Sequence, residues 1–348
     1  MNKVKIDGQF VGKGEPCFII AEAGSNHNRD INLALKLIDV AADAGADAVK
    51  FQNFKANSLY HRKAGQSDYL KIKKSIYRVI EEMEMPDDWI PKLAKYAQKK
   101  GIMFFSAPTD PYCVDVVVQN SPILKVASYE LSNVPLVRYM ASFGKPLILS
   151  TGAHNLNEIS QAIQIVLQEG NDKIILMQCT ASYPAPLDSL NLNVIPALAA
   201  EFKCPVGFSD HSSDPVLAPV AAVALGACCL EKHFTLDKKL YGPDHRFALD
   251  PKELKLMVKK VREAEQALGS SMKKVGKVEK ELYKFARRSI FAIANITRGE
   301  KMTDRNIAVL RCGRLPKGLS PDSFDSILGK KAKRTIKNGQ PITKACYA

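Results

Sequence analysis

The sequence predicts a (β/α)8 TIM barrel followed by a small C-terminal β-rich domain. Eight short apolar segments with β-strand character alternate with amphipathic helical patterns over roughly the first 268 residues, a pattern typical of a barrel built from β/α units. The strand candidates are apolar through most of their length, as expected when helices cover their outer faces. The charge balance then changes abruptly near residue 269.

The strand candidates are short runs rich in β-branched and aliphatic residues. In chain order they occupy residues 17–24, 47–52, 102–108, 123–128, 145–152, 173–180, 204–211 and 228–234. A doubly wound open sheet shows a similar alternation of strands and helices and is the alternative. No glycine-rich phosphate-binding loop supports it.

Two of the intervening segments carry clear helix signals. Residues 31–45 place apolar side chains at helical spacing, and Gly45 is a stop signal at the end of that pattern. Residues 87–101 begin with acidic side chains and end with two lysines and Gly101, the order that the helix dipole favours.

The chain divides into three parts. Residues 1–268 form the predicted catalytic barrel, residues 269–281 a polar and basic linker, and residues 282–348 the small domain. The small domain contains a weak repeat with a period of 40 residues, and each copy predicts a strand, a turn centred on glycine and a second strand. The matching positions are Ile296, Gly299 and Thr303 in one copy and Ile336, Gly339 and Thr343 in the other.

The composition is that of a soluble globular protein. Hydrophobic residues make up 46% and charged residues 25% of the 348 residues, which excludes a disordered, collagen-like or disulfide-scaffold protein. No apolar run reaches the roughly 18 residues that a membrane span needs, and the N-terminus lacks the apolar region of a secretory signal. The eight cysteines are scattered without CxxC spacing, so we expect reduced thiols in a cytoplasmic protein.

Nearly all of the net positive charge lies in the last part of the chain. Residues 269–348 carry 19 Lys and Arg against 6 Asp and Glu, whereas residues 1–268 carry 31 against 30. Such a segment can bind nucleic acid, steer an anionic small molecule toward a cleft, or form a solvated surface. The small domain has few aromatic residues for base stacking and no RNA-binding motif, which argues against nucleic acid.

Every strand candidate ends in polar or ionisable residues, whereas the opposite ends are apolar or loop-like. The chemistry of a TIM barrel sits at the carboxyl ends of its strands, so this asymmetry predicts an active site at that rim. The residues concerned are Glu22, Lys50, Gln52, Ser106, Lys125, Ser128, Ser150, Thr180, Ser209, Asp210, His211, Glu231 and His233.

The predicted metal ligands are His211 and His233, which end adjacent strand candidates. Two imidazoles that leave coordination positions open suit a catalytic divalent metal. No cysteine cluster accompanies them, so we do not expect a closed structural zinc site. The alternative is a pair of hydrogen-bonded structural histidines.

An anion-binding set is predicted at the same rim. It consists of Lys50, Lys125, Ser128, Ser150 and Ser209, which together suit a phosphate or a carboxylate. A buried lysine on a barrel strand could instead form a Schiff base with a carbonyl substrate, and each serine could instead cap a helix.

Two glutamates are candidates for acid–base work. Glu22 follows an apolar strand and, near a metal and a phosphate, could act as a general base or position a water molecule. Glu130 is the second candidate. The alternative for each is a surface acid or a helix cap.

Longer motifs run along almost the whole chain. In the barrel region they are IIAEAGSNH (19–27), AVKFQ (48–52), LKVASYE (124–130), GKPLILSTG (144–152), QCTASYPAP (178–186), GFSDHS (207–212), ALGACCLEKHFTLD (224–237) and GPDHRFALDP (242–251). In the small domain they are RSIFAIANITRGE (288–300) and LGKKAKRTIKNGQPI (328–342). Together they resemble the sialic acid synthase family, which condenses phosphoenolpyruvate with an N-acylated amino sugar and carries a C-terminal antifreeze-like (SAF, β-clip) domain.

The resemblance implies roles for individual residues. His211 and His233 match the family's two metal ligands, usually occupied by manganese, with Mg²⁺ or Co²⁺ as alternatives. Glu22 matches its active-site glutamate. The phosphoenolpyruvate-binding positions correspond to Lys50, Lys125, Ser128 and Ser209, and the positions that hold the open-chain sugar to Gln52, Tyr183 and Asp244.

The resemblance also implies a partner and shows two departures. Arg311 matches an arginine of the antifreeze-like domain that reaches the partner subunit's barrel in a domain-swapped homodimer. Ala181 stands where bacterial members often carry an Asn that helps bind phosphoenolpyruvate, and Ala107 where some carry Thr. These departures bear on the phosphate shell and on the choice of sugar rather than on the reaction type.

The expected activity is therefore that of an N-acetylneuraminate synthase, a metal-dependent, C–O bond-cleaving transferase. It would join phosphoenolpyruvate to an open-chain N-acyl hexosamine such as N-acetylmannosamine, or its 6-phosphate, and release a 2-keto-3-deoxy sugar acid and phosphate. Pseudaminate, legionaminate and spore-coat sugar acid synthases resemble the same sequence motifs and are the alternatives. The rival hypotheses are a Schiff-base pyruvate aldolase and a non-catalytic barrel with a nucleic-acid-binding tail. We expect neither a nucleic-acid nor a membrane partner.

Overall fold

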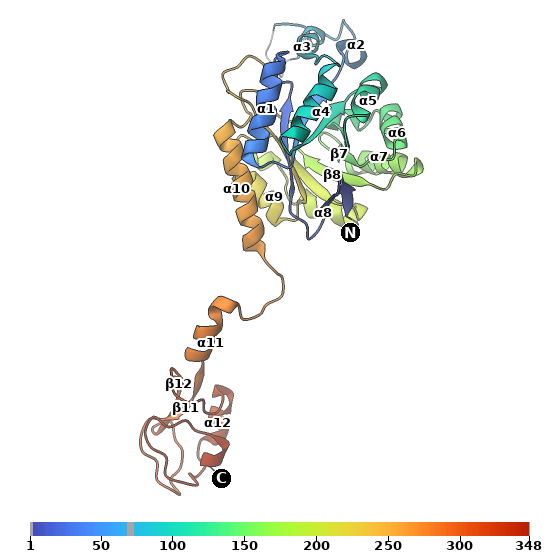
Figure 1. Ribbon diagram of the computed structural model, residues 1–348. Coiled ribbons are helices and arrows are strands. Elements are labelled where there is room, and N and C mark those ends of the chain that lie inside the picture. Colours follow the sequence, from blue (N-terminus) through green and yellow to red (C-terminus); the bar gives the residue numbers. More distant parts are fainter. Residues whose placement is uncertain (1–2, 68–72, 348) are drawn as a thin grey trace. The chain divides into compact units, whose positions relative to one another are not determined.

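The structure is a computed structural model that describes residues 3–67 and 73–347 (Figure 1). It divides into two compact units, Met1–Gly269 and Ser270–Ala348. Each unit is described by itself. None of the described helices is long and apolar enough to cross a lipid bilayer, and all eight cysteines are free.

The first unit is built around a parallel sheet of eight strands. In hydrogen-bonded order these are β5 (Met103–Pro108), β4 (Ala48–Asn53), β3 (Phe18–Gly24), β10 (Cys229–His233), β9 (Val206–Asp210), β8 (Ile174–Cys179), β7 (Leu147–Ser150) and β6 (Leu124–Val126). The first and last of these strands along the chain are paired, with His233 opposite Glu22. Strands β5 and β6 also lie in contact, so the sheet is nearly closed. The predicted barrel is confirmed, and the open doubly wound sheet is excluded.

Helices surround this sheet in the order expected of β/α units (Figure 1). They are α1 (Ile31–Ala44), α2 (Ala56–Leu59), α3 (Ile76–Met83), α4 (Trp89–Lys99), α5 (Pro111–Val118), α6 (Val134–Ser142), α7 (Leu156–Gln168), α8 (Val194–Phe202), α9 (Leu217–Ala224) and α10 (Pro251–Leu268). The expected local signals fix their ends. Asp30 caps the start of α1, and Gly45 ends it in a left-handed conformation with φ of 81°. Asn155 and Asp250 form capping boxes at the starts of α7 and α10.

The barrel unit has two hydrophobic cores. The larger one lies between the outer faces of the strands and the helices. The smaller one fills the amino-terminal end of the barrel interior, and a hairpin that the sequence analysis did not predict contributes to it. This hairpin pairs β1 (Val4–Ile6) with β2 (Gln9–Val11), and three of its apolar side chains pack among inward-facing residues such as Ile123. The hairpin therefore closes one end of the barrel.

The second unit is a small β-rich domain. The segment predicted as a polar and basic linker, residues 269–281, contains a 3-10 turn, η3 (Lys277–Glu279), and leads into α11 (Lys280–Phe285). The domain pairs β11 (Arg288–Ala292) antiparallel to β12 (Ile307–Arg311), and a short helix, α12 (Phe324–Ile327), follows. Its own core is small, with ten buried hydrophobic residues.

The internal repeat brings its two copies together. Ile296 and Ile336 exchange two backbone hydrogen bonds of 2.8 Å each. The predicted turn at glycine is present in each copy, but the flanking residues form isolated bridges such as Ile296 to Ile336 and Lys301 to Lys331 rather than the predicted strands. Gly299 and Gly339 adopt φ of 87° and 83°, and the chain reverses at each of them before a longer ladder can form.

Candidate active site

The polar residues of the predicted site point into the barrel, one inward-facing position closer to the carboxyl ends of the strands than the apolar inner core. Side chains two residues apart on a strand lie on the same face of the sheet. Ile20, Ala48, Ile123 and Ile148 belong to the small inner core. Two residues further along the same strands stand Glu22, Lys50, Lys125 and Ser150, all buried.

Lys50 forms the centre of this polar cluster. Its Nζ lies 2.9 Å from Oε2 of Glu22 and 3.6 Å from Oε1 of Glu231. Gln52, the next inward residue on β4, donates a hydrogen bond of 2.8 Å from Nε2 to Oε1 of Glu22. The three strands β4, β3 and β10 are neighbours in the sheet, and this order explains why the three charged side chains meet.

The two carboxylates around Lys50 differ in their affinity for a proton. Burial raises the pKa of Glu22 to about 7, although Lys50 acts in the opposite direction. Burial also acts to raise the pKa of Glu231, but Lys50 and Lys125 together hold it below its ordinary value. Burial acts to lower the pKa of Lys50, and the two carboxylates outweigh it and raise that pKa. Glu22 is therefore the carboxyl group suited to accept and release a proton near neutral pH.

The remaining anion-binding candidates line the other side of the barrel interior. Lys125 donates a hydrogen bond of 2.6 Å to the Ser150 hydroxyl, and burial lowers the pKa of Lys125. Ser209 donates to Oε1 of Glu231 at 3.2 Å. The Ser128 hydroxyl accepts a hydrogen bond of 3.1 Å from the backbone N–H of Gly152. Ser150 does not cap the following helix, because Asn155 does.

The two candidate metal ligands lie side by side. The rings of His211 and His233 are 5.5 Å apart between centroids. Nδ1 of His211 lies 2.8 Å from the carbonyl oxygen of Thr180, so Nδ1 carries the proton and Nε2 is left to accept one or to bind a metal. Nδ1 of His233 is buried and has no hydrogen-bond partner among the residues that the structure describes, and Oδ2 of Asp244 lies 3.5 Å from it.

This arrangement fits a divalent metal held by two imidazoles and completed by water or substrate. A metal–nitrogen bond is about 2 Å long, so rings this close can share one ion. Within residues 3–67 and 73–347, no group of three or more His, Cys, Asp or Glu side chains forms a ready-made metal site. Burial holds the pKa of His233 well below its ordinary value, which keeps this imidazole in the neutral form that binds metals.

The mouth of the site carries the predicted sugar-binding residues. A Cβ atom added to Gly24 would lie 3.4 Å from Oε1 of Glu22 and 3.5 Å from both Oδ2 of Asp244 and Nε2 of Gln52. These three polar groups therefore surround a hollow next to the Gly24 backbone. The ring of Tyr183 lies 4.1 Å from that of His211 between centroids, and burial raises the pKa of Asp244 to about 6.

The two remaining predicted residues lie on elements other than the eight barrel strands. Glu130 accepts a hydrogen bond of 3.4 Å from Asn133. Burial raises the pKa of Glu130, and the negative charge of Asp110 acts in the same direction. Arg311 is the exposed last residue of β12, in the second unit.

Sequence reasoning assigned no role to three residues of the site. Glu231 was noted only as a polar strand end, yet it contacts both Lys50 and Ser209. Cys179 lies 3.5 Å from the Ser128 hydroxyl and 3.8 Å from Nδ1 of His211. Phe247 packs against the ring of His233. Alternation of inward-facing residues along β10 and β8 was the signal that could have identified Glu231 and Cys179.

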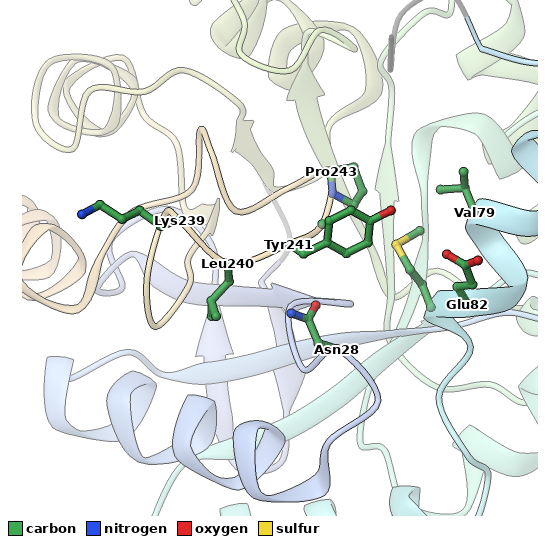
Figure 2. Close-up of a pocket in the computed structure, with 9 residues that line it drawn as sticks. Asn28, Val79, Glu82, Lys239, Leu240, Tyr241 and Pro243 are labelled. Atoms are coloured by element: carbon green, nitrogen blue, oxygen red, sulfur yellow. The ribbon is translucent and has the colours of Figure 1, made fainter. Parts of the chain in front are cut away.

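A separate cavity of about 440 Å³ opens beside this centre. Figure 2 shows its lining residues, with Glu82 and Val79 of α3 on one side of the Tyr241 ring and Asn28 below it. None of its lining residues belongs to the predicted site, but the loop from Lys239 to Pro243 continues directly into Asp244.

Comparison with known proteins identifies the family. Residues 37–273 match the NeuB family. The chain belongs to the NeuB family. Residues 287–348 match the SAF domain, so this NeuB-family chain joins a barrel to a C-terminal SAF domain, and the resemblance to sialic acid synthases is confirmed.

Relatives within the family span almost the whole chain. The chain is 44% identical to the spore coat polysaccharide biosynthesis protein SpsE of Bacillus subtilis, with 97% of this chain and 95% of the relative covered. It is 40% identical to N,N'-diacetyllegionaminic acid synthase of Campylobacter jejuni, with 93% and 98% covered. The crystal structure of N-acetylneuraminic acid synthetase from Leptospira borgpetersenii in complex with citrate matches with a TM-score of 0.74 and 33% identity, covering 82% of this chain and 96% of that one.

Proposed function

We propose that this protein condenses phosphoenolpyruvate with an open-chain N-acyl hexosamine and water, giving a 2-keto-3-deoxy sugar acid and phosphate. The observation that carries the proposal is the buried cluster of Lys50, Glu22 and Glu231 beside Lys125, at the carboxyl ends of the strands of a NeuB-family barrel. N-Acetylmannosamine or its 6-phosphate is the first candidate sugar. The relatives named above make a legionaminate-type or spore-coat sugar the alternative.

The anion-binding set would hold phosphoenolpyruvate. Lys50 and Lys125 supply positive charge to its phosphate and carboxylate, and Ser128, Ser150 and Ser209 supply hydroxyl donors. Because these groups are already buried and hydrogen-bonded, little reorganisation accompanies binding. Fixing the enol carbon opposite the aldehyde removes much of the entropic cost of bringing the two reactants together.

The mouth residues would hold the sugar. Gln52 and Asp244 border the hollow beside Gly24 and can bind its hydroxyl groups, while Tyr183 packs against the imidazole of His211. A divalent ion, Mn²⁺ in the first instance, would be held by His211 and His233 and would polarise the aldehyde oxygen as a Lewis acid.

Glu22 would carry out the proton transfer. The C3 carbon of phosphoenolpyruvate attacks the aldehyde carbon, and positive character develops at C2. Water adds to C2 as Glu22 accepts one of its protons. The resulting tetrahedral intermediate breaks its C2–O(phosphate) bond, the leaving phosphate takes up the proton of the C2 hydroxyl, and the keto acid remains. The alkoxide formed from the aldehyde takes up the proton that Glu22 has accepted. Glu231 stays ionised and holds Lys50 and Ser209 in place.

The resemblance to sialic acid synthases supports a further part of the proposal, a domain-swapped homodimer. Residues 269–276, which precede the 3-10 turn η3, span at most about 28 Å when extended. In that arrangement Arg311 would complete the sugar site of the partner barrel.

A phosphate-release assay tests the reaction. Purified protein with Mn²⁺ and phosphoenolpyruvate is given a panel of N-acyl hexosamines, their 6-phosphates and diacetamido-dideoxy hexoses. We expect sugar-dependent phosphate release, with ¹⁸O from the bridging position of phosphoenolpyruvate recovered in phosphate. Borohydride trapping of pyruvate on a lysine, without phosphate release, would instead support the Schiff-base aldolase.

A further inference from the structure

Lys232 occupies an unusual position beside the candidate metal ligands. It lies between Glu231 and His233 on β10, and its side chain, 2% exposed, points to the opposite face of the strand from theirs. Its Nζ donates to Oδ2 of Asp210 at 2.6 Å, to the carbonyl oxygen of Ser212 at 2.5 Å and to its hydroxyl at 3.1 Å. A fourth bond of 3.1 Å reaches the carbonyl oxygen of Asp214.

These bonds enclose the residue between Asp210 and Ser212, which is His211. Lys232 pairs with Asp210 in the β9–β10 ladder, and the second carboxylate oxygen of Asp210 accepts a hydrogen bond of 2.8 Å from the backbone N–H of Ser212. Both neighbours of His211 are thus attached to one ammonium group. On its other side, the carbonyl oxygen of His211 accepts from the N–H of Ala185 at 2.9 Å.

A buried ion pair of this kind is a costly way to stabilise a fold. Apolar residues of similar volume often stabilise a fold equally well, because the desolvation of two charges offsets their attraction. A polar network in which every donor and acceptor is paired instead holds the groups that it joins in one defined arrangement. Lys232 has every donor occupied, and the geometry that it fixes is the loop that carries His211 relative to the strand that carries His233.

We infer that Lys232 is a positioning residue that sets the separation of the His211 and His233 imidazoles and thereby the affinity of the site for a divalent metal. The inference rests on the metal site put forward under the proposed function. It concerns a side chain that touches neither substrate nor metal and acts only through Asp210, Ser212 and Asp214.

The test compares metal affinity with stability in the full-length protein. Mn²⁺ binding is measured by the loss of the electron paramagnetic resonance signal of free Mn²⁺, and stability by thermal unfolding. Lys232→Met keeps a long apolar stem and removes the donors. The matched control is Lys145→Met, because Lys145 also donates to two backbone carbonyl oxygens, those of Val118 and Ser121, but does so at the start of β7, away from the site.

We expect Lys232→Met to weaken Mn²⁺ binding by at least about tenfold, the lower end of the range for residues that orient metal ligands. Lys145→Met should lower the unfolding temperature but leave Mn²⁺ affinity within twofold of wild type. If Lys232→Met does not fold, Asp210→Asn and Ser212→Ala, which each remove one part of the network, should give smaller losses of affinity in the same direction.

Two outcomes are distinguishable. If Lys232→Met folds and binds Mn²⁺ with wild-type affinity, the inference is wrong and the metal site stands. The same conclusion follows if Asp210→Asn and Ser212→Ala both bind Mn²⁺ with wild-type affinity. A wild-type protein that binds no Mn²⁺ would overturn the proposed metal site, and the inference with it.

Discussion

The ammonium nitrogen of Lys50 lies 2.9 Å from a carboxylate oxygen of Glu22, and both side chains are buried. Despite this contact, burial raises the pKa of Glu22 to about 7. A general base must be ionised, so activity should increase as the pH rises through about 7 and Glu22 loses its proton. The measurement is kcat/KM between pH 5.5 and 9, where we expect an acidic limb with its midpoint near 7.

Replacement of Glu22 by Gln separates proton transfer from binding. The amide keeps the size and the hydrogen-bonding capacity of the side chain but does not accept the proton. Turnover should fall by roughly 10² to 10⁴, while the KM values for both substrates should change far less. Unchanged turnover combined with a weakened KM would make Glu22 a binding residue only.

Gly24→Ala tests the hollow at the mouth. The added methyl group would lie 3.4 to 3.5 Å from Glu22, Gln52 and Asp244, in the space assigned to the sugar. The φ of 52° at Gly24 adds backbone strain, which the control must match. The KM for the sugar should rise by roughly tenfold, equal to about 1.4 kcal/mol of lost binding, and that for phosphoenolpyruvate much less. Gly144→Ala is the control, because Gly144 has a φ of 63°, similar to that of Gly24, and, its chain neighbours apart, no atom of the described residues lies within 4 Å of the added methyl group. Equal effects of the two variants on the sugar KM would argue against the assignment.

Metal removal tests the histidine pair. Chelation should abolish turnover, and Mn²⁺ should restore it. His233→Ala should keep its thermal unfolding transition and lose activity, because a single remaining imidazole holds the ion poorly. The Lewis-acid role would be wrong if His233→Ala, treated with chelator, turned over at a near-normal rate.

His27 makes stability depend on pH. Its Nδ1 accepts a hydrogen bond from the backbone N–H of Arg29, its Nε2 has no partner among the described residues, and burial lowers its pKa to about 4. Between the ordinary value of 6.5 and about 4, the unfolded chain binds a proton that the folded chain does not. The free energy of unfolding should therefore fall as the pH drops through this window, by up to about 1.4 kcal/mol per pH unit.

The matched variant is His27→Phe, which keeps a ring against Phe51 and Trp89 but does not titrate. Urea unfolding at pH 7 and pH 5 should show a smaller loss of stability for this variant than for wild type. Equal losses of stability in the two proteins would mean that His27 binds its proton as readily in the folded chain as in the unfolded chain.

Subunit mixing tests the role of Arg311. Chains with Arg311→Ala are mixed with chains carrying Glu22→Gln, each inactive or nearly so alone. In a swapped dimer one of the two sites of a heterodimer combines an intact barrel with an intact arginine, so part of the activity should return. If exchange of subunits is demonstrated and activity stays at the level of the separate variants, Arg311 does not serve the partner's barrel.

Much of the site could be predicted because a parallel barrel directs all strand ends to one rim. A polar residue that follows an apolar strand, such as Glu22, Lys50 or Lys125, is placed at that rim by the strand pattern alone. Period-two alternation then decides that Lys50 and Gln52 share the inner face. These are local signals, and the sequence contains them in full.

The rest depends on relations between distant strands. The contact of Glu231 with Lys50 requires β10, β3 and β4 to be neighbours, a consequence of barrel closure that no local pattern contains. Which of the two glutamates keeps its proton depends on burial and on the position of Lys125. The N-terminal hairpin escaped prediction because its strands are three residues long, too short to establish a period.

That hairpin has a kinetic consequence. Because the apolar side chains of β1 and β2 fill the amino-terminal end of the barrel, we expect substrates and products to exchange with solvent past the carboxyl ends of the strands. Ser209 of β9 lies two residues before His211, which follows that strand, and Glu231 lies two residues before His233 on β10, so both lie deeper in the barrel. A sugar held at the mouth would therefore block the route to the anion-binding residues below it. Turnover should then follow a compulsory order. Phosphoenolpyruvate should bind before the sugar, and inorganic phosphate should dissociate only after the sugar acid has left.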